Sequence, residues 1–151
     1  MSAQTRNFLR YWLPALAWTA LIFFFSTSSF SADHTGYILR WLLTWVFGYV
    51  SSPMFIFLHV LIRKTAHVTV YALLSLFWFR ARRGPRSGWQ PGWALLALLV
   101  SMLVAIGDEF HQSFLPSRTG TPWDVLLDSM GALLMQAWLA LRARRRPHSP
   151  A

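Results

Sequence analysis

Two long stretches without charge constrain the fold of this chain more than any other feature. The segments Trp12–Ser31 and Gly92–Gly107 contain no Lys, Arg, Asp or Glu, and 55% of all residues are hydrophobic. A membrane-spanning helix needs about 20 mostly apolar residues to cross about 30 Å of hydrocarbon. A backbone inside the bilayer must also satisfy its own hydrogen bonds, which a helix does. The sequence therefore predicts an all-α integral membrane protein.

Breaks at Pro and Gly residues divide the chain into four predicted spans. We expect them at about residues 9–27, 54–79, 92–110 and 123–141, forming a four-helix bundle in a single transmembrane domain over residues 1–151. Residues 28–36 form a polar turn after the first span. The segment Tyr37–Val50 is too short to span and carries Arg40 among aromatic residues. We interpret it as a short interfacial helix, with a re-entrant helix as the alternative.

Basic residues gather at the ends of the predicted spans. Ten of the fourteen fall in three groups: Arg6 and Arg10; Arg80, Arg82, Arg83 and Arg86; and Arg142, Arg144, Arg145 and Arg146. Four spans place these groups on one side of the membrane, and such groups mark the cytoplasmic side. We predict a multi-pass protein of the cell inner (cytoplasmic) membrane with both termini, including the basic tail over residues 142–151, in the cytoplasm. The net charge of +9 then indicates topology and attraction to anionic lipid, not nucleic-acid binding.

Acidic residues gather at the opposite ends of the spans. The chain has five, and four of them lie close together in the sequence: Asp108, Glu109, Asp124 and Asp128. At about 1.5 Å per helical residue, His67, Asp108 and Asp128 lie about 20–24 Å from the cytoplasmic ends of three different helices. A charge at that depth is costly unless it faces a bundle interior or a wet cavity. We therefore predict that these three side chains line one polar pocket near the outer leaflet.

The acidic residues are expected to meet the basic residues of the same region. Arg63, Lys64 and Arg118 would balance the four acids, either around a binding site or in a structural ion-pair network. Lys64, His67 and Tyr71 share one helix face by their spacing. Gln112 follows Asp108 by four residues and faces the same way, whereas His111 points elsewhere.

Several of these residues also have a purely structural interpretation. Thr121, Pro122 and Asp124 form a helix-start pattern with Thr as N-cap, which alone could account for Asp124. Asp128 lies one turn deeper and cannot cap the helix. His67 could be a hydrogen-bonded core histidine, and Arg63 and Lys64 could mark the interface by snorkelling. Gly131 gives its helix a small face for close packing.

These residues together resemble a known family. The pattern is Lys64-x-x-His67-x-x-x-Tyr71-x-x-Leu74, then Asp108-Glu109-x-x-Gln112-x-x-x-Pro116-x-Arg118, then Asp124-x-x-x-Asp128-x-x-Gly131. It is similar to the VanZ-like family of small bacterial membrane proteins, named after a teicoplanin-resistance protein, over roughly Trp12 to Leu141. Asp128 stands where the family usually has Asn, and Val70 where an acid often precedes the Tyr. The resemblance implies a role in glycopeptide susceptibility or in cell-envelope lipids, without an established reaction.

Three functions fit the polar residues. The first is binding of a lipid-linked or anionic headgroup, such as a lipid-linked cell-wall precursor, at the outer leaflet. Its ligand-binding candidates are Arg63, Lys64, Tyr71, Gln112, Arg118 and Asp124. The second is a membrane-embedded acid–base or metal-assisted enzyme acting on a lipid or cell-wall precursor. Its catalytic candidates are His67, Asp108, Glu109 and Asp128. The third is a small transporter, which an unrepeated four-span chain favours least.

Other features narrow the chemistry. The chain has no cysteine, which excludes disulfides, cysteine-ligated zinc and iron–sulfur clusters. It contains no HExxH or GxSxG motif and no Gly-rich phosphate loop. We assign no metal site, because three cations fall among the acids, and the sequence identifies neither a cofactor nor an oligomeric state.

Overall fold

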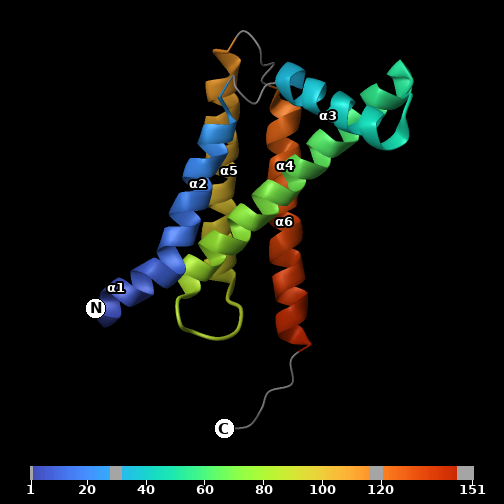
Figure 1. The fold of residues 1–151 in the computed structure, drawn as a ribbon. Helices are drawn as coiled ribbons and strands as arrows, with labels where there is room; N and C mark the ends of the chain where they lie inside the picture. The colour runs from blue at the N-terminus through green and yellow to red at the C-terminus, as the bar shows by residue number, and fades with distance from the viewer. Residues whose placement is uncertain (1, 28–31, 116–120, 146–151) are drawn as a thin grey trace.

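The computed structural model describes residues 2–27, 32–115 and 121–145, and this part of the chain is helical with no strand (Figure 1). Its elements are α1 (Ala3–Asn7), η1 (Phe8–Trp12), α2 (Leu13–Phe25), α3 (Ala32–Phe47), α4 (Ser52–Arg83), α5 (Pro91–Ser113) and α6 (Pro122–Arg144). Four continuous helices are long and apolar enough to cross a membrane: Ala3–Phe25, Ser52–Arg83, Pro91–Ser113 and Pro122–Arg144. The predicted all-α membrane fold with four long helices is confirmed.

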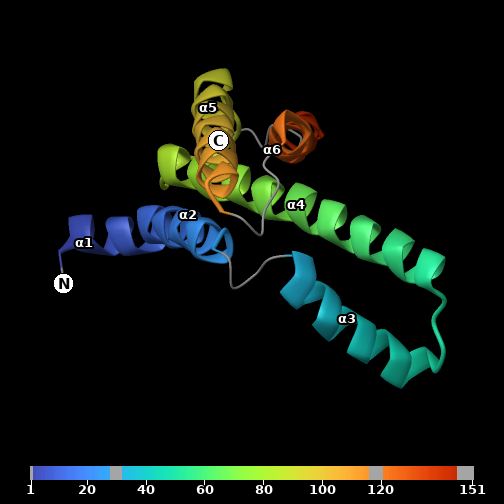
Figure 2. The same ribbon diagram turned by 90° about the horizontal axis from the view of Figure 1, so that it is seen from above.

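Helix α4 is the centre of the assembly. It packs against α6, α5 and α2, whereas α2 and α5 make little contact with each other. Figures 1 and 2 show α4 crossing the other long helices obliquely, so that its N-terminal half leaves α5 and α6. Burial follows this crossing, because every buried residue of α4 lies at or after Tyr71.

The first membrane helix contains one wide turn. Leu13 donates its N–H to the carbonyl of Phe8, five residues back, so that Phe8–Trp12 form a π-helical turn. Pro14 follows this turn directly. A proline inside a helix has no N–H to donate, and its ring collides with the carbonyl four residues back. The extra residue in the turn relieves that collision and lets Ala3–Phe25 continue as one helix.

Helix α3 departs from the prediction. It begins at Ala32, inside the segment predicted as a polar turn, and ends at Phe47, not at Val50. The end is set by Gly48, which has a φ of 72° and donates its N–H to the carbonyl of Thr44 at 2.9 Å. A glycine at this position is the common helix stop, because other residues resist the left-handed conformation. Residues 28–31 lie outside the described part of the chain.

Helix α3 packs against the N-terminal half of α4 and leaves most of its own surface uncovered. Gly36 faces the ring of His59, and the guanidinium of Arg40 lies 4.2 Å from the ring centroid of Phe55. Large side chains such as Trp45, which is 75% exposed, point away from the protein. An amphipathic helix with exposed aromatic residues suits the membrane interface.

A close backbone approach and a hydrogen-bonded amide both join α4 to α6 in the core of the bundle. A Cβ added to Gly131 would lie 2.3 Å from the carbonyl oxygen of Val68, so no side chain fits there. The predicted close packing at Gly131 is therefore confirmed. Further along both helices, toward Arg83 and Arg142, the Gln136 amide donates to the Ser75 hydroxyl at 2.7 Å and to the Ser75 carbonyl at 3.2 Å.

The groups of basic residues lie at one end of the bundle. Arg80 and Arg83 of α4 share a hollow with Arg142 of α6, and residues of α1 and η1 share another with Gly84 and Pro85 of the α4–α5 loop. Figure 1 shows α1, the α4–α5 loop and the last turn of α6 toward the same end. We call it the arginine-rich end.

Candidate functional site

A histidine–carboxylate pair joins α4 to α6 on the far side of the core from the arginine-rich end. Nδ1 of His67 lies 3.1 Å from Oδ1 of Asp128, and Asp128 is only 1% exposed. It is the only salt bridge among the residues that the structure describes. The two helices bring these side chains together because Gly131, one turn after Asp128, lets α6 approach the backbone of α4 at Val68. The pairing of His67 with Asp128 agrees with their equal predicted depth.

A second carboxylate, Asp108 of α5, is bound by neutral donors. The Tyr71 hydroxyl donates to Oδ2 of Asp108 at 3.4 Å, and the Gln112 amide donates to the same oxygen at 3.1 Å. All three side chains are buried. The bond from Gln112 confirms the shared face that their four-residue spacing predicts.

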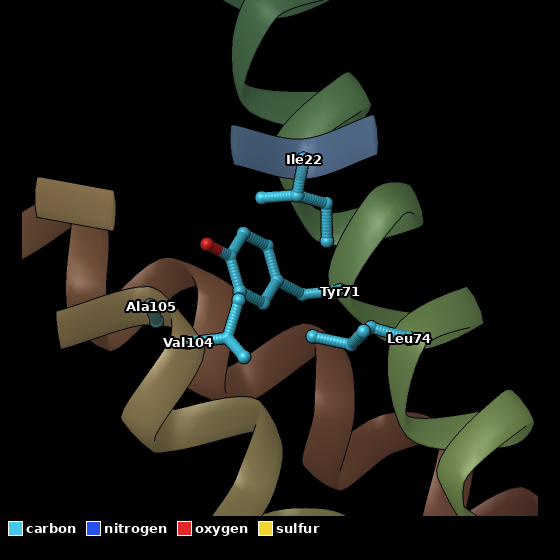
Figure 3. Close-up of a cluster of buried hydrophobic side chains, with 5 residues drawn as sticks. All are labelled: Ile22, Tyr71, Leu74, Val104 and Ala105. Carbon is cyan, nitrogen blue, oxygen red and sulfur yellow. The ribbon is translucent and has the colours of Figure 1, made fainter. Parts of the chain in front are cut away.

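The Tyr71 ring is fixed by apolar neighbours, which determines where its hydroxyl points. Figure 3 shows the ring between Ile22 of α2 and Val104 of α5, with Leu74 one turn along α4. Tyr71 is 1% exposed. A buried ring packed on both faces has few positions open to it, so the hydroxyl is held toward Asp108.

The two remaining acids stabilise the start of α6. Thr121 is the N-cap, and its hydroxyl accepts from the N–H of Asp124 at 3.3 Å and donates to Oδ2 of Asp124 at 3.1 Å. The N–H of Thr121 donates to Oε1 of Glu109. The predicted helix-start pattern is confirmed, and Glu109 shares in it from α5. Both acids therefore have a structural role that needs no ligand.

A cavity of about 230 Å³ lies beside these polar groups, between α2, α4 and α5. His67, Tyr71, Asp108 and Gln112 form its polar wall, and Trp18, Leu21, Ile22 and Phe25 of α2 are among its apolar lining. Oδ1 of Asp108 is buried and has no hydrogen-bond partner among the described residues. His67 and Asp108 line this cavity as predicted, whereas Asp128 does not line it and lies behind His67 as its partner.

The predicted pairing of the acids with basic residues is wrong for two of the three cations. Arg63 lies 3.5 Å from the Thr35 hydroxyl of α3 and lines a neighbouring hollow with His67. Lys64 is exposed. Within the described ranges, neither forms a salt bridge with a carboxylate. The reason is the oblique course of α4, which moves Lys64 away from α5 and α6 even though its spacing from His67 and Tyr71 suggests one face. Arg118 lies outside the described residues.

Three contacts beside the site were not predicted. The Trp18 indole donates to the Val70 carbonyl at 3.0 Å and attaches α2 to α4. His111, expected to point elsewhere, lies 3.3 Å from the Ser26 hydroxyl at the end of α2. Gln136, a lone amide in an apolar helix, bonds to Ser75. Only the last had a signal in the sequence, because an amide inside a membrane span needs a partner.

The carboxylates are dispersed over separate partners. The described residues contain no group of three or more His, Asp or Glu side chains placed to hold a metal ion. The arrangement offers one histidine oriented by a buried carboxylate. It also offers a second carboxylate, Asp108, which lines the cavity and has one oxygen without a hydrogen-bond partner among the described residues. Such a site can accept hydrogen bonds from a hydroxyl or amide and can exchange a proton.

Comparison with known proteins identifies a family and no nearer relative. No curated protein and no solved structure matches the chain. The model of the VanZ/LLP1 family matches residues 11–142, which include α4 and α5 in full, most of the first and last long helices, and every residue of the site. The chain is a multi-pass membrane protein that belongs to the VanZ/LLP1 family.

Proposed function

We propose that this is a cell-envelope protein whose cavity binds the headgroup of a lipid-linked molecule from the outer leaflet. The observation that carries the proposal is Asp108, which lines the cavity and has one buried carboxylate oxygen without a hydrogen-bond partner among the described residues. Buried acceptors are normally hydrogen-bonded, and one left open beside a cavity favours a ligand that donates. Hydroxyl and amide groups of a sugar or peptide headgroup are such donors.

The neighbouring hollow supports a phosphate-bearing ligand. Arg63 and His67 line this hollow, next to the cavity that His67 shares with Asp108. Arg63 forms no salt bridge within the described ranges, and guanidinium groups are the preferred partners of phosphate. A headgroup with a phosphate near Arg63 and hydroxyls near Asp108 would match both hollows. Lipid-linked cell-wall precursors have this composition.

This function would place the protein beside the targets of glycopeptide antibiotics. With the arginine-rich end in the cytoplasm, the cavity opens toward the outer leaflet, where lipid-linked precursors are exposed. Holding or covering such a molecule would change its access to a teicoplanin-type antibiotic. Membrane lipids are the corresponding partners.

A second candidate function rests on the pair of His67 and Asp128. A histidine that is oriented by a buried carboxylate and faces a cavity is a common general base. His67 would accept the proton of a ligand hydroxyl, and Asp128 would stabilise the resulting imidazolium. Asp108 and Tyr71 would then position the ligand in a membrane-embedded enzyme acting on a lipid or cell-wall precursor.

The test compares two matched substitutions. Asp108→Asn keeps one acceptor oxygen for Tyr71 and Gln112 but replaces the other oxygen, which has no partner among the described residues, with an amide donor. Asp124→Asn makes the same change at the start of α6, outside the cavity. Native mass spectrometry of the purified proteins, with lipid-linked disaccharide–peptide precursor added, should show binding to wild type and Asp124→Asn and a loss in Asp108→Asn. Equal binding by all three proteins would contradict the proposal.

Two further measurements separate binding from catalysis. Teicoplanin susceptibility of cells that express each protein should follow precursor binding. A binding protein returns the precursor unchanged after incubation, whereas the enzyme converts it and loses conversion in His67→Gln while retaining binding. If Asp108→Asn leaves teicoplanin susceptibility unchanged, the cavity has no role in antibiotic resistance.

A further inference from the structure

A second, larger hollow lies at the arginine-rich end, about 640 Å³ in volume and far along α4 from the polar cavity. Its wall contains Arg80 and Arg83 from α4, Trp89 from the α4–α5 loop, and Trp138 and Arg142 from α6. Figure 1 shows the C-terminal end of α4, the α4–α5 loop and the last turns of α6 toward the lower end of the bundle. The role proposed above uses none of these residues.

The hollow concentrates positive charge without an acid to offset it. Three arginines line it, and none of its lining residues is acidic. Four of the five acids in the chain belong to the polar cluster near the start of α6, and the fifth, Asp33, belongs to α3. No described residue therefore supplies a counter-charge to the hollow.

Two donors in this wall point to a ligand more directly. Nε of Arg83 and Nε1 of Trp89 are buried and have no hydrogen-bond partner within the described ranges. Both atoms can only donate. Buried donors are nearly always satisfied, so an acceptor with several oxygens is the group that the wall fits. Arginine binds phosphate oxygens through two parallel N–H bonds, which a carbonyl or a hydroxyl cannot match.

The arginines are also held in position. The guanidinium of Arg83 lies 5.9 Å from the ring centroid of Phe79, and that of Arg142 lies 5.1 Å from the ring of Trp138. Ring contacts of this kind are also made by Arg86, 5.9 Å from Trp93, so they do not by themselves mark the site. What distinguishes Arg83 from Arg82 is its place, because Arg83 is half-buried and lines the hollow, whereas Arg82 is exposed and does not.

We propose that this hollow binds a phosphate group, and that the phosphate belongs to the headgroup of an anionic phospholipid. Trp89 and Trp138 are typical of the membrane–water interface, which is the level of lipid headgroups. Basic pockets between membrane helices on the cytoplasmic side bind such headgroups elsewhere. The site would hold the lipid between α4 and α6 and fix the arginine-rich end of both helices.

The test uses the full chain in detergent micelles, with lipid binding measured by native mass spectrometry and by the shift in melting temperature. The probes are phosphatidylglycerol, phosphatidylcholine, inorganic phosphate and glycerol phosphate. Wild type should bind phosphatidylglycerol saturably and more tightly than phosphatidylcholine, whose choline offsets the phosphate charge. Arg83→Gln should weaken phosphatidylglycerol binding about tenfold, because it removes charge-assisted hydrogen bonds. Arg82→Gln removes the same charge next to the site and should bind like wild type.

Three results would overturn the proposal. Equal weakening by Arg82→Gln and Arg83→Gln would mean that only the general charge of this end matters. Equal binding of phosphatidylglycerol and phosphatidylcholine by wild type would show that the site does not require an anionic headgroup. Stabilisation by inorganic phosphate or glycerol phosphate that equals that of phosphatidylglycerol would reject the lipid as the source of the phosphate.

A second pair of variants keeps the test decisive if Arg83→Gln does not fold. Arg142 and Arg144 are both exposed near the end of α6, and only Arg142 lines the hollow. Arg142→Gln should weaken phosphatidylglycerol binding, and Arg144→Gln should leave it unchanged. Wild-type binding by both variants would contradict the proposal.

Discussion

His67 and Asp128 form a contact of 3.1 Å between α4 and α6, and the carboxylate is almost completely buried. The second oxygen of Asp128 is buried too and has no hydrogen-bond partner among the described residues. Among the described residues, the contact with His67 is therefore the only one that offsets the cost of burying this carboxylate. Its removal should be one of the most damaging polar changes in the bundle.

We predict that Asp128→Ala is less stable than Asp128→Asn. Asp128→Ala removes the acceptor beside Nδ1 of His67 and should lower the free energy of unfolding by about 2–3 kcal/mol, because a half-buried donor loses its partner. Asp128→Asn keeps an acceptor oxygen for a neutral His67 and should cost about 1 kcal/mol. Equilibrium unfolding in mixed micelles measures both values. An Asn variant as unstable as the Ala variant would show that the charge, not the hydrogen bond, is essential.

A methyl group at Gly131 should separate α4 from α6. Gly131→Ala places its Cβ 2.3 Å from the Val68 carbonyl oxygen, which belongs to the backbone and cannot rotate away. We expect a loss of about 3 kcal/mol or more, at the upper end for overpacking. Gly107→Ala is the matched control, because its Cβ would lie 3.6 Å from Phe23, an ordinary contact distance. The same unfolding assay should find no loss for the control.

The cap of α6 should depend on a hydroxyl and not on the rest of the threonine side chain. Thr121→Ala removes the acceptor of the Asp124 N–H and should cost about 1 kcal/mol. Thr121→Ser keeps the hydroxyl and should unfold at nearly the same denaturant concentration as wild type. If Ser and Ala variants lose the same amount, the methyl group of Thr121 contributes the stability instead of the cap.

The orientation in the membrane can be tested with single cysteines, because the chain has none of its own. Ser87, in the α4–α5 loop, and Ser113, at the end of α5, are both exposed and lie at opposite ends of one helix. With the basic groups in the cytoplasm, an impermeant maleimide should label Ser113→Cys in intact cells. It should label Ser87→Cys only after the membrane is opened. The reverse pattern would invert the proposed topology.

The sequence alone predicts the parts of the fold that depend on short-range spacing. Apolar length and the breaks at Pro and Gly identify the four long helices. The Thr121 cap and the bond from Gln112 to Asp108 follow from positions three and four residues apart. The helical rise per residue predicts that His67 and Asp128 lie at the same depth in the membrane, because each depth is measured from the cytoplasmic end of its own helix. Each of these predictions uses one helix at a time.

The errors arise where two helices meet. The position of Lys64 depends on the angle at which α4 crosses α5 and α6, and no residue of α4 encodes that angle by itself. Helix α3 begins at Ala32 although polar residues there suggest a turn. The bond from Trp18 to the Val70 carbonyl also needs two helices in place, since an indole in an apolar run gives no indication of its partner.

The approach of Gly131 to Val68 has a mechanical consequence for the neighbouring histidine. Side chains can change rotamer to make room, but two peptide backbones that are already in contact can hardly move closer together. The spacing between His67 and Asp128, one turn away, is therefore set by a rigid stop and not by adjustable packing.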